Sequence, residues 1–258
     1  MCGLISVLLA PKERDPWELD RIWDIFTEAL IQNEERGREA TGVGVVQEDG
    51  SRRVWKLPLP AHEFVETADY RRHARRAFDN GTVCLLGHTR RPTKGKVGNS
   101  RNNHPLLTPN IIGIHNGNID NDDQLFGDYK LPRLGEVDSE AIFALLETIP
   151  PHARGGAYHQ AVRGRARRLV GKMTTVSLDR RRPGQLLVLK RDMPFSMHYN
   201  PDFDAMFYSS RYVFLRKAFG RSVITEALES KRGYIFDRLR FSELETRYSR
   251  CFTLKRPQ

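Results

Sequence analysis

The most reactive residue type in this chain stands at its second position. Cys2 follows Met1, and a small second residue allows aminopeptidases to remove an initiating methionine. The mature chain would then begin with Cys2, which would carry a thiol and a free α-amine on one residue. An α-amine has a pKa of about 7.7–8.0, so a fraction is neutral near pH 7 and can act as a general base for the thiol. A cysteine at position two can also be incidental, so this residue alone does not decide the chemistry.

Two groups of polar residues further along the chain could surround such a thiol. They are Gly87-His88-Thr89-Arg90 with Thr93 and Asn102-Asn103-His104-Pro105, and the shorter run His115-Asn116-Gly117. An Asn side-chain amide and a Gly backbone N–H can converge to stabilise an oxyanion, which makes Asn116 and Gly117 candidates for that role. The plainer interpretation is that Asn-Gly forms a tight turn at the end of a strand.

An arginine and an aspartate facing one pocket could bind a free amino acid by its two charged groups. Arginine offers a bidentate fork to the α-carboxylate, and aspartate offers the charge opposite to the α-ammonium. Arg90 and Asp138 are the candidates. Asp138 precedes Ser139 and Glu140, where it could instead serve only as the N-cap of a helix.

The elements that must position these residues follow from apolar spacing and turn residues. Strands are expected over 2–9, 41–47, 53–57, 82–86, 111–115, 172–178, 185–190 and 205–209, and helices over 62–78, 139–148 and 157–169. A further helix starts at Asp15-Pro16 and continues until Gly37, with Trp17, Ile22, Ile25, Phe26 and Leu30 at helical spacing.

The polar stretch from Gly87 to Pro109 is expected to be a long irregular loop with a function. Residues 41–57 are expected to form a hairpin around Asp49-Gly50. This order of strands and helices predicts a single α+β domain over residues 1–258, with mainly hairpin-connected sheets.

Composition excludes several classes of protein. The chain has 258 residues, of which 39% are hydrophobic and 29% are charged, so it can form an ordinary core. Its three cysteines are far apart, which argues against a disulfide scaffold and against paired zinc ligands. The apolar run Leu4 to Ala10 is too short to span a membrane and lacks the basic start of a secretion signal. We therefore expect a soluble, cytoplasmic protein.

Taken in order along the chain, the candidate residues resemble the class II glutamine amidotransferases, which are N-terminal nucleophile hydrolases. The motifs are Met1-Cys2-Gly3, Arg36-Gly37 with Thr41-Gly42, Gly87-His88-Thr89-Arg90, Asn102-x-His104-Pro105, His115-Asn116-Gly117-x-Ile119 and Asp138-Ser139-Glu140. Weaker landmarks follow at Arg168-Leu169-Val170-Gly171 and Tyr208-Ser209-Ser210. Each motif is common by itself, but the ordered set beginning at Cys2 is specific.

The resemblance implies a fold and a role for each matching residue. The fold is a four-layer αββα sandwich, in which two antiparallel sheets lie between helix layers. Cys2 resembles the nucleophile that attacks the glutamine side-chain amide, giving a γ-glutamyl thioester and ammonia. The other implied positions are Asn116 and Gly117 in the oxyanion hole, Arg90, Thr93 and Asp138 on the substrate, and Arg36 and His104 as supporting residues. The resemblance implies neither a metal nor an organic cofactor. A purely structural role stays open for Arg36, Thr93 and His104.

Two positions depart from the family pattern. Arg91 stands where many relatives carry an aromatic residue, and Lys94 stands where some carry histidine. Both belong to the loop that closes over glutamine in the family. The chain also ends at Gln258 without a synthase domain, so we expect either a separate acceptor-binding partner that receives the ammonia or outright hydrolysis of the amide.

The distribution of charge leaves a different function open. The chain has a net charge of +10, and residues 163–191 contain ten Lys or Arg residues and one acid. Such a segment could meet nucleic acid or a phosphorylated partner, or could be only a solvated helix face and turn. It lacks interleaved aromatic residues and known nucleic-acid-binding motifs, so a non-catalytic nucleic-acid-binding protein is not favoured. A third hypothesis is an amidase of the same fold that acts on another γ-glutamyl amide, since Arg90 and Asp138 would bind any free glutamyl α-end.

Overall fold

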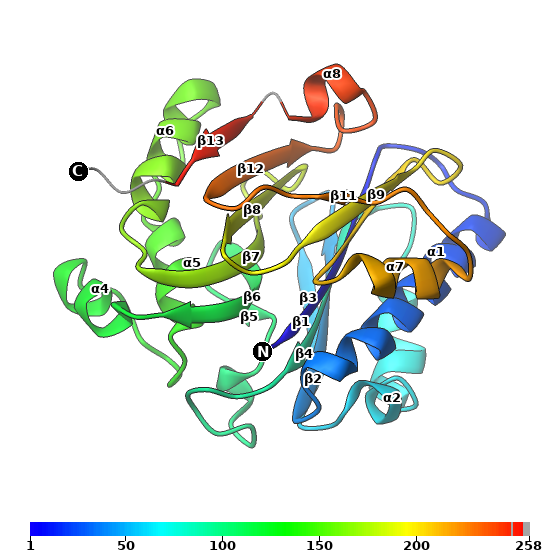
Figure 1. Ribbon diagram of the computed structural model, residues 1–258, viewed down its shortest axis with the longest axis horizontal. Coiled ribbons are helices and arrows are strands. Elements are labelled where there is room, and N and C mark those ends of the chain that lie inside the picture. Colours follow the sequence, from blue (N-terminus) through cyan, green and yellow to red (C-terminus); the bar gives the residue numbers. More distant parts are fainter. Residues whose placement is uncertain (249, 255–258) are drawn as a thin grey trace.

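Two antiparallel sheets face one another across an apolar core, and helices cover the outer face of each sheet (Figure 1). The computed structural model describes residues 1–248 and 250–254. Three clusters of buried apolar side chains separate the four layers, one between the sheets and one under each helix layer. This arrangement confirms the predicted αββα sandwich.

Sheet A carries the N-terminal strand near its centre. Its strands, in spatial order, are β11 (Glu226–Ala227), β9 (Ser196–Asn200), β10 (Ala205–Ser209), β1 (Gly3–Leu9), β4 (Thr82–Arg90), β2 (Ala40–Gln47) and β3 (Arg52–Leu57). All seven residues of β1 are buried because β1 has a neighbour on both sides and a layer on both faces.

Sheet B forms the second inner layer. Its strands, in spatial order, are β13 (Cys251–Thr253), β12 (Arg232–Asp237), β8 (Gln185–Arg191), β7 (Gly171–Asp179), β6 (Ile111–Ile119) and β5 (Leu106–Leu107). Ile112, Ile114, Val176 and Val188 face the core between the sheets, against residues such as Leu4 and Leu86 of sheet A.

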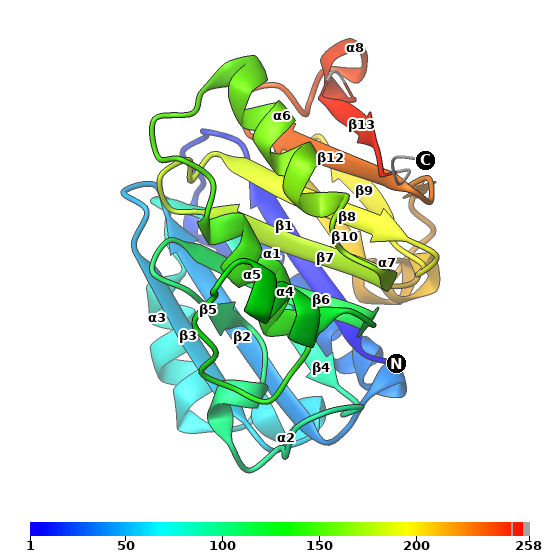
Figure 2. The ribbon, with the colours of Figure 1, turned by 90° about the vertical axis from the view of Figure 1, so that its left-hand side faces the viewer.

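The helices divide between the two outer layers. On sheet A lie α1 (Pro16–Asn33), α2 (Ala61–Phe64), α3 (Arg75–Ala77) and α7 (Tyr212–Phe219), whereas α4 (Asp122–Asp128), α5 (Ser139–Glu147) and α6 (Gly155–Ala166) cover sheet B (Figure 2). Short helical turns are η1 (Glu34–Arg36), η2 (Asp69–Ala74) and η3 (Ser100–Asn102), and α8 (Leu244–Arg247) precedes β13.

The long helix α1 begins where the sequence predicted. Asp15 and Glu18 form a reciprocal capping box, since Glu18 N–H donates to Asp15 Oδ1 at 2.8 Å and Asp15 N–H donates to Glu18 Oε2 at 3.0 Å. Ile22 and Phe26 are fully buried, as their spacing indicated, but Trp17 is 67% exposed because it lies in the first turn, beyond the edge of the core.

Two further predictions are wrong in their boundaries. The helix predicted over 62–78 is three separate pieces, α2, η2 and α3, of which η2 is a π-type turn. The strands predicted to end at Leu86 and His115 continue to Arg90 and Ile119. The loop predicted from Gly87 therefore begins after Arg90. These boundaries are wrong because the polarity of a residue does not by itself indicate a loop. His88, Arg90 and Asn116 are instead buried at the strand ends, where each makes a hydrogen bond.

Candidate functional site

Strand pairing places Cys2 beside the end of β4. Because β1 and β4 are antiparallel, Gly3 faces Thr89 in register, and Arg90 and Arg91 continue along the same edge. The backbones approach so closely that a Cβ on Gly3 would lie 2.4 Å from Thr89 Oγ1. Residues far apart in the sequence are thus neighbours at the N-terminal end of β1.

Asn116 reaches Cys2 from β6 in the opposite sheet. The Cys2 backbone nitrogen donates a hydrogen bond of 2.9 Å to Asn116 Oδ1. At the other end of the same amide, Asn116 Nδ2 is buried and has no hydrogen-bond partner among the residues that the structure describes. A buried donor without a partner costs free energy, so Nδ2 is available to a group that enters the site.

The residue after Asn116 has a backbone conformation that favours glycine. Gly117 has a φ of +143°, and a Cβ at this position would lie 2.0 Å from the carbonyl oxygen of Lys172. Asn116 and Gly117 lie within β6, paired with Thr174 and Met173 of β7, rather than in the tight turn that an Asn-Gly pair can form.

The Cys2 thiol contacts the backbone of Arg91. Arg91 N–H donates to Cys2 Sγ at 3.4 Å, and Sγ also lies 3.6 Å from the Arg91 carbonyl oxygen. Burial raises the pKa of the Cys2 thiol, while the Arg91 N–H, the positive chain terminus and Arg90 lower it. The net shift is upward, so this thiol needs a base before it can act as a nucleophile.

Three polar side chains fix the backbone around Cys2. Arg36 Nε donates a 2.8 Å hydrogen bond to the carbonyl oxygen of Cys2. Leu4 N–H donates to Ser210 Oγ at 2.9 Å, which holds the start of β1 in place. Ser209 Oγ accepts from Asn33 Nδ2 at 3.0 Å. The late Ser209-Ser210 landmark therefore lies against the start of β1.

Arg90 is buried, and its guanidinium is largely engaged by its own loop. Nη1 donates to Asn103 Oδ1 at 2.7 Å, and Nη2 donates to the carbonyl oxygens of Lys94 and Gly95 at 2.7 and 2.9 Å. An arginine has five N–H donors, so Nε and one hydrogen of Nη1 remain without a hydrogen-bond partner among the described residues. The sequence analysis gave Asn103 no role of its own, although Asn103 lies within the Asn102–Pro105 motif.

Asp138 does not act as a helix cap. It precedes α5, but its side chain makes no capping hydrogen bond. Instead Asp138 Oδ2 accepts a 2.6 Å hydrogen bond from Ile119 N–H at the end of β6. Asp138 and Arg90 both act electrostatically on the Cys2 thiol: the negative charge of Asp138 raises the pKa of the thiol, and the positive charge of Arg90 lowers it.

The segment between Arg90 and η3 is tied to helix α4 by an ion pair. Lys94 Nζ lies 2.5 Å from Asp122 Oδ2, and Arg133 lies 3.2 Å from the same oxygen. Asp122 is buried, whereas Lys94 is 41% exposed at its side chain. Thr93 is exposed and makes no hydrogen bond or ion pair with any described residue. Sequence reasoning missed Asp122 because an acid in the first turn of a helix has an ordinary role.

Histidines fill a buried polar region between the sheets. His104 stacks on His88 with ring centroids 4.3 Å apart, and both ring nitrogens of His104 lack partners within the described ranges. His88 Nε2 bonds to the His115 carbonyl oxygen at 3.0 Å, and His115 Nδ1 bonds to Ser139 Oγ at 2.8 Å. His104 thus contacts another histidine, and no contact of it with the Cys2 thiol is observed.

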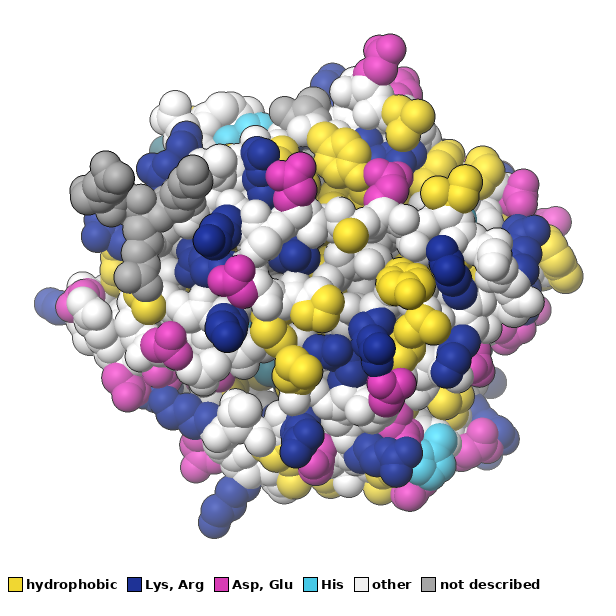
Figure 3. All heavy atoms as spheres, in the orientation of Figure 1, with side chains coloured by type: hydrophobic (Ala, Val, Ile, Leu, Met, Phe, Trp, Pro, Cys, Tyr) yellow, Lys and Arg dark blue, Asp and Glu magenta, His cyan; other side chains and the backbone are white. Residues whose placement is uncertain are grey.

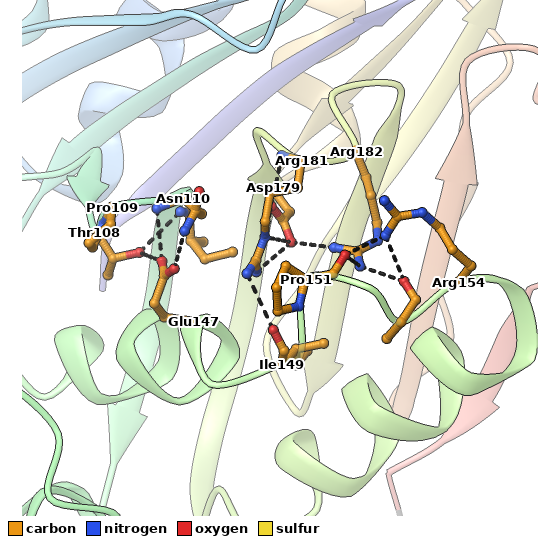
Figure 4. A network of polar contacts seen from close by, with 12 residues as sticks. Thr108, Pro109, Asn110, Glu147, Ile149, Pro151, Arg154, Asp179, Arg181 and Arg182 are labelled. Carbon is orange, nitrogen blue, oxygen red and sulfur yellow. Dashed lines mark hydrogen bonds and ion pairs between the residues drawn. The ribbon is translucent and has the colours of Figure 1, made fainter.

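Much of the basic segment 163–191 forms internal contacts. Asp179 lies between Arg181 and Arg182, each at 2.7 Å, and Figure 4 shows this group beside Glu147, which Asn110 binds. On the face drawn in Figure 3, Lys and Arg side chains are interspersed with Asp and Glu. This pattern gives no support to a continuous nucleic-acid-binding surface on that face.

Within residues 1–248 and 250–254, no group of three or more His, Cys, Asp or Glu side chains could bind a metal ion. Over the same residues, no helix combines the length and the apolar composition needed to cross a membrane. All three cysteines are free thiols.

Comparison with known proteins places these observations in a family context. No family model matches the chain. It is 24% identical over 216 residues to 7-cyano-7-deazaguanine synthase of Sulfolobus acidocaldarius, which covers 81% of this chain and 43% of that protein. It is 28% identical over 201 residues to glutamine–fructose-6-phosphate aminotransferase of Shigella flexneri, which covers 75% of this chain and 29% of that protein. The chain thus spans less than half the length of these relatives.

Solved structures share the fold. Glutamine phosphoribosylpyrophosphate amidotransferase of B. subtilis superimposes with a TM-score of 0.64 at 16% identity, covering 92% of this chain and 47% of that chain. A glutamine aminotransferase class-II domain protein from Silicibacter pomeroyi gives a TM-score of 0.53 at 13% identity, covering 91% and 94%.

The sandwich of two antiparallel sheets between helix layers is thus the fold that this chain shares with these solved structures. The sequence relatives, at 24% and 28% identity, include a glutamine-dependent aminotransferase by name, so the chain is similar to proteins of the kind that the ordered motifs resemble. The roles of the individual site residues remain predictions.

Proposed function

We propose that this protein hydrolyses the side-chain amide of glutamine through a γ-glutamyl thioester on Cys2, giving glutamate and ammonia. The observation that carries the proposal is the arrangement of the Asn116 side-chain amide at Cys2. Its Oδ1 accepts from the Cys2 nitrogen, and its Nδ2 is left as an unpartnered buried donor. This is the arrangement that a nucleophile beside an oxyanion site requires.

The first half of the reaction needs the amino group of Cys2. Removal of Met1, which is 63% exposed, converts the Cys2 amide into an α-amine. The amine takes the thiol proton, directly or through a water molecule, and the thiolate attacks the amide carbon of glutamine. Asn116 Nδ2 and Gly117 N–H stabilise the oxyanion. When the C–N bond breaks, the α-ammonium returns its proton to the leaving nitrogen, which departs as ammonia.

The second half consumes the thioester. The same α-amine takes a proton from a water molecule, whose oxygen attacks the thioester carbon. The carbon–sulfur bond then breaks, and the proton returns to the thiolate, which releases glutamate and restores Cys2. The second proton of the water stays on the new γ-carboxyl group, which loses it to the solvent to give glutamate, and the steps balance without a metal or an organic cofactor.

The protein recognises glutamine by its α-carboxylate and α-ammonium groups. In this proposal the free donors of Arg90 bind the α-carboxylate, Asp138 binds the α-ammonium, and Thr93 supplies a further contact when the loop closes. Arg36 maintains the position of Cys2, and His104 supports the neighbouring strands from inside the molecule.

We propose a separate acceptor-binding protein as the destination of the ammonia. The relatives named above are a synthase and an aminotransferase, which supports an acceptor for the released nitrogen. The proposal places the reaction in the cytoplasm, whose reducing conditions suit three free thiols.

A covalent probe tests the nucleophile and the substrate class together. A glutamine-mimicking diazo-ketone should label Cys2 of the full chain, located by mass spectrometry on a peptide that begins with Cys2. Cys2→Ala should lose both labelling and glutamate release, while Cys251→Ala, which removes another half-buried free thiol, should retain them. Labelling elsewhere, or glutaminase activity in Cys2→Ala, contradicts the proposal. Faster turnover of another γ-glutamyl amide than of glutamine would favour the amidase of the same fold.

A further inference from the structure

Four of the eight arginines in the basic segment 163–191 have no side-chain hydrogen bond or ion pair with a described residue; they are Arg163, Arg167, Arg168 and Arg180. Arg165 Nε donates to Thr148 Oγ1 at 2.7 Å, and Arg181 and Arg182 bind Asp179. Arg167 and Arg168 make no side-chain hydrogen bond and no ion pair with a residue of the described chain. The Nε atom of Arg167 is moreover buried without a partner. A partly desolvated guanidinium without a counter-ion is unfavourable, so its environment is suited to an anion.

These two arginines line one large cavity. It has a volume of about 690 Å³ and is lined by residues of α4, of the C-terminal end of α6 and of the segment that follows α6. Both helices lie on the outer side of sheet B (Figure 2). The other walls of the cavity include Gln124 and Tyr129, and Asp128 is bound by Gln124 at 3.2 Å. The volume is within the range of about 300–1,000 Å³ that small-molecule sites occupy.

Hydrogen bonds join the two backbone segments that form the floor of the cavity, one at Asn121 and the other at residues 168–170. Asn121 Nδ2 donates to the Arg168 carbonyl oxygen, and Asn121 Oδ1 accepts from Val170 N–H, each at 2.9 Å. Asp120 N–H donates to the Val170 carbonyl oxygen at 2.8 Å. These bonds fix the segment that carries both arginines before any ligand arrives, which lowers the entropic cost of binding.

We propose that this cavity binds a small phosphate-bearing ligand. Two adjacent guanidinium groups match the charge and the geometry of a phosphate group better than one lysine would. Tyr129, Leu125 and the open space beside Gly164 leave room for an uncharged portion of the ligand. The ligand is chemically distinct from glutamine, and its binding does not depend on the proposed glutaminase activity.

The chain leads directly from β6, the strand that carries Asn116 and Gly117, to the lining of the cavity. Ile119, whose N–H binds Asp138, is followed directly by Asp120 and by Asn121 in the cavity floor. A ligand in the cavity would therefore contact Asn121, which lies two residues after Ile119, the residue whose N–H binds Asp138.

Thermal unfolding of the full chain at constant ionic strength tests the site. Inorganic phosphate and pyrophosphate should raise the Tm saturably, by about 3 °C, because a ligand that binds the folded state stabilises it. The double variant Arg167→Met with Arg168→Met should lose this shift, and calorimetric titration should show affinity weakened at least about tenfold. Arg163→Met is the control, since Arg163 lies in α6, just before the two arginines, and is exposed and outside the cavity lining.

The outcomes separate the proposal from simpler effects. Acetate at the same ionic strength should give no comparable shift. An equal shift with acetate would overturn the assignment to phosphate, and an equal shift in the double variant would overturn the site. Because the ligand-induced change is compared within each variant, a lower Tm of the double variant alone does not affect the result.

Discussion

The side-chain amide of Asn116 contacts Cys2 with one end and leaves the other end free. Oδ1 lies 2.9 Å from the Cys2 nitrogen, and Nδ2 is buried without a partner in the part of the chain described. One residue from the second sheet thus both orients the amine of the proposed base and offers a donor beside the thiol. The two functions can be separated by substitution.

Asn116→Asp should retain the acceptor and lose the donor. We expect kcat for glutamine hydrolysis to fall about 10²–10³-fold with a smaller change in KM, because an oxyanion-hole donor acts mainly in the transition state. Steady-state glutamate release measures both constants. Asn118→Ala is the control, since the Asn118 side chain is exposed and donates to Asp120. A rate unchanged in Asn116→Asp contradicts the role of Nδ2.

The Lys94–Asp122 ion pair should determine how well the loop binds glutamine. Arg90 bonds the carbonyl oxygens of Lys94 and Gly95, so releasing Lys94 from α4 loosens the residues around the proposed clamp. We expect Lys94→Met to raise KM about fivefold, equivalent to about 1 kcal/mol, with little change in kcat.

Three further measurements test whether the rise in KM comes from loss of the Lys94–Asp122 ion pair. Lys94→Arg should restore most of the affinity, and hydrogen exchange should rise across residues 91–99 in Lys94→Met even without substrate. Lys96→Met, at another exposed lysine of the loop, should leave KM unchanged. If Lys94→Met and Lys96→Met behave alike, the ion pair does not position the loop.

The buried histidines should make the protein less stable in mild acid. Burial lowers the pKa of His88 to about 3, whereas an unfolded histidine takes up its proton near pH 6.5. The unfolded state therefore binds more protons as pH falls, so the stability present above about pH 6.5 declines toward pH 3. We expect His88 to contribute a loss of about 2 kcal/mol between pH 6.5 and 5.

Denaturant unfolding at several pH values measures this dependence. His88→Gln keeps a donor for the His115 carbonyl oxygen but cannot be protonated, so the slope of stability against pH should become shallower by about one proton. His73→Gln is the control because His73 is exposed. Identical slopes in the wild type and His88→Gln would show that His88 is not kept neutral.

Gly117→Ala should lower both stability and activity. The φ of +143° and the 2.0 Å approach of an added Cβ to Lys172 require β6 or β7 to move, at a cost of about 2–3 kcal/mol. Gly127→Ala provides the comparison, since Gly127 lies in α4 with open space around it and alanine favours a helix. Unchanged denaturation midpoints for Gly117→Ala would contradict the strain.

The sequence by itself determined the class of the fold and most candidate site residues. The Asp15-Pro16 helix start, the hairpin of β2 and β3 and the apolar strands are local patterns, because capping, turn chemistry and side-chain alternation act over a few residues. The ordered motifs beginning at Cys2 indicated the family in the same way, since each motif is a short local run.

Only the tertiary structure decided how the polar residues are used. His88, Arg90 and Asn116 were predicted to lie in loops or turns because isolated polar side chains favour solvent, yet they extend β4 and β6 into the interior. Two of them are bonded by distant segments, His88 by the His115 carbonyl oxygen and Asn116 by Cys2, whereas Arg90 is bonded by its own loop. Such pairs have no signal in the local sequence, since the two partners become neighbours only when the sheets pack together.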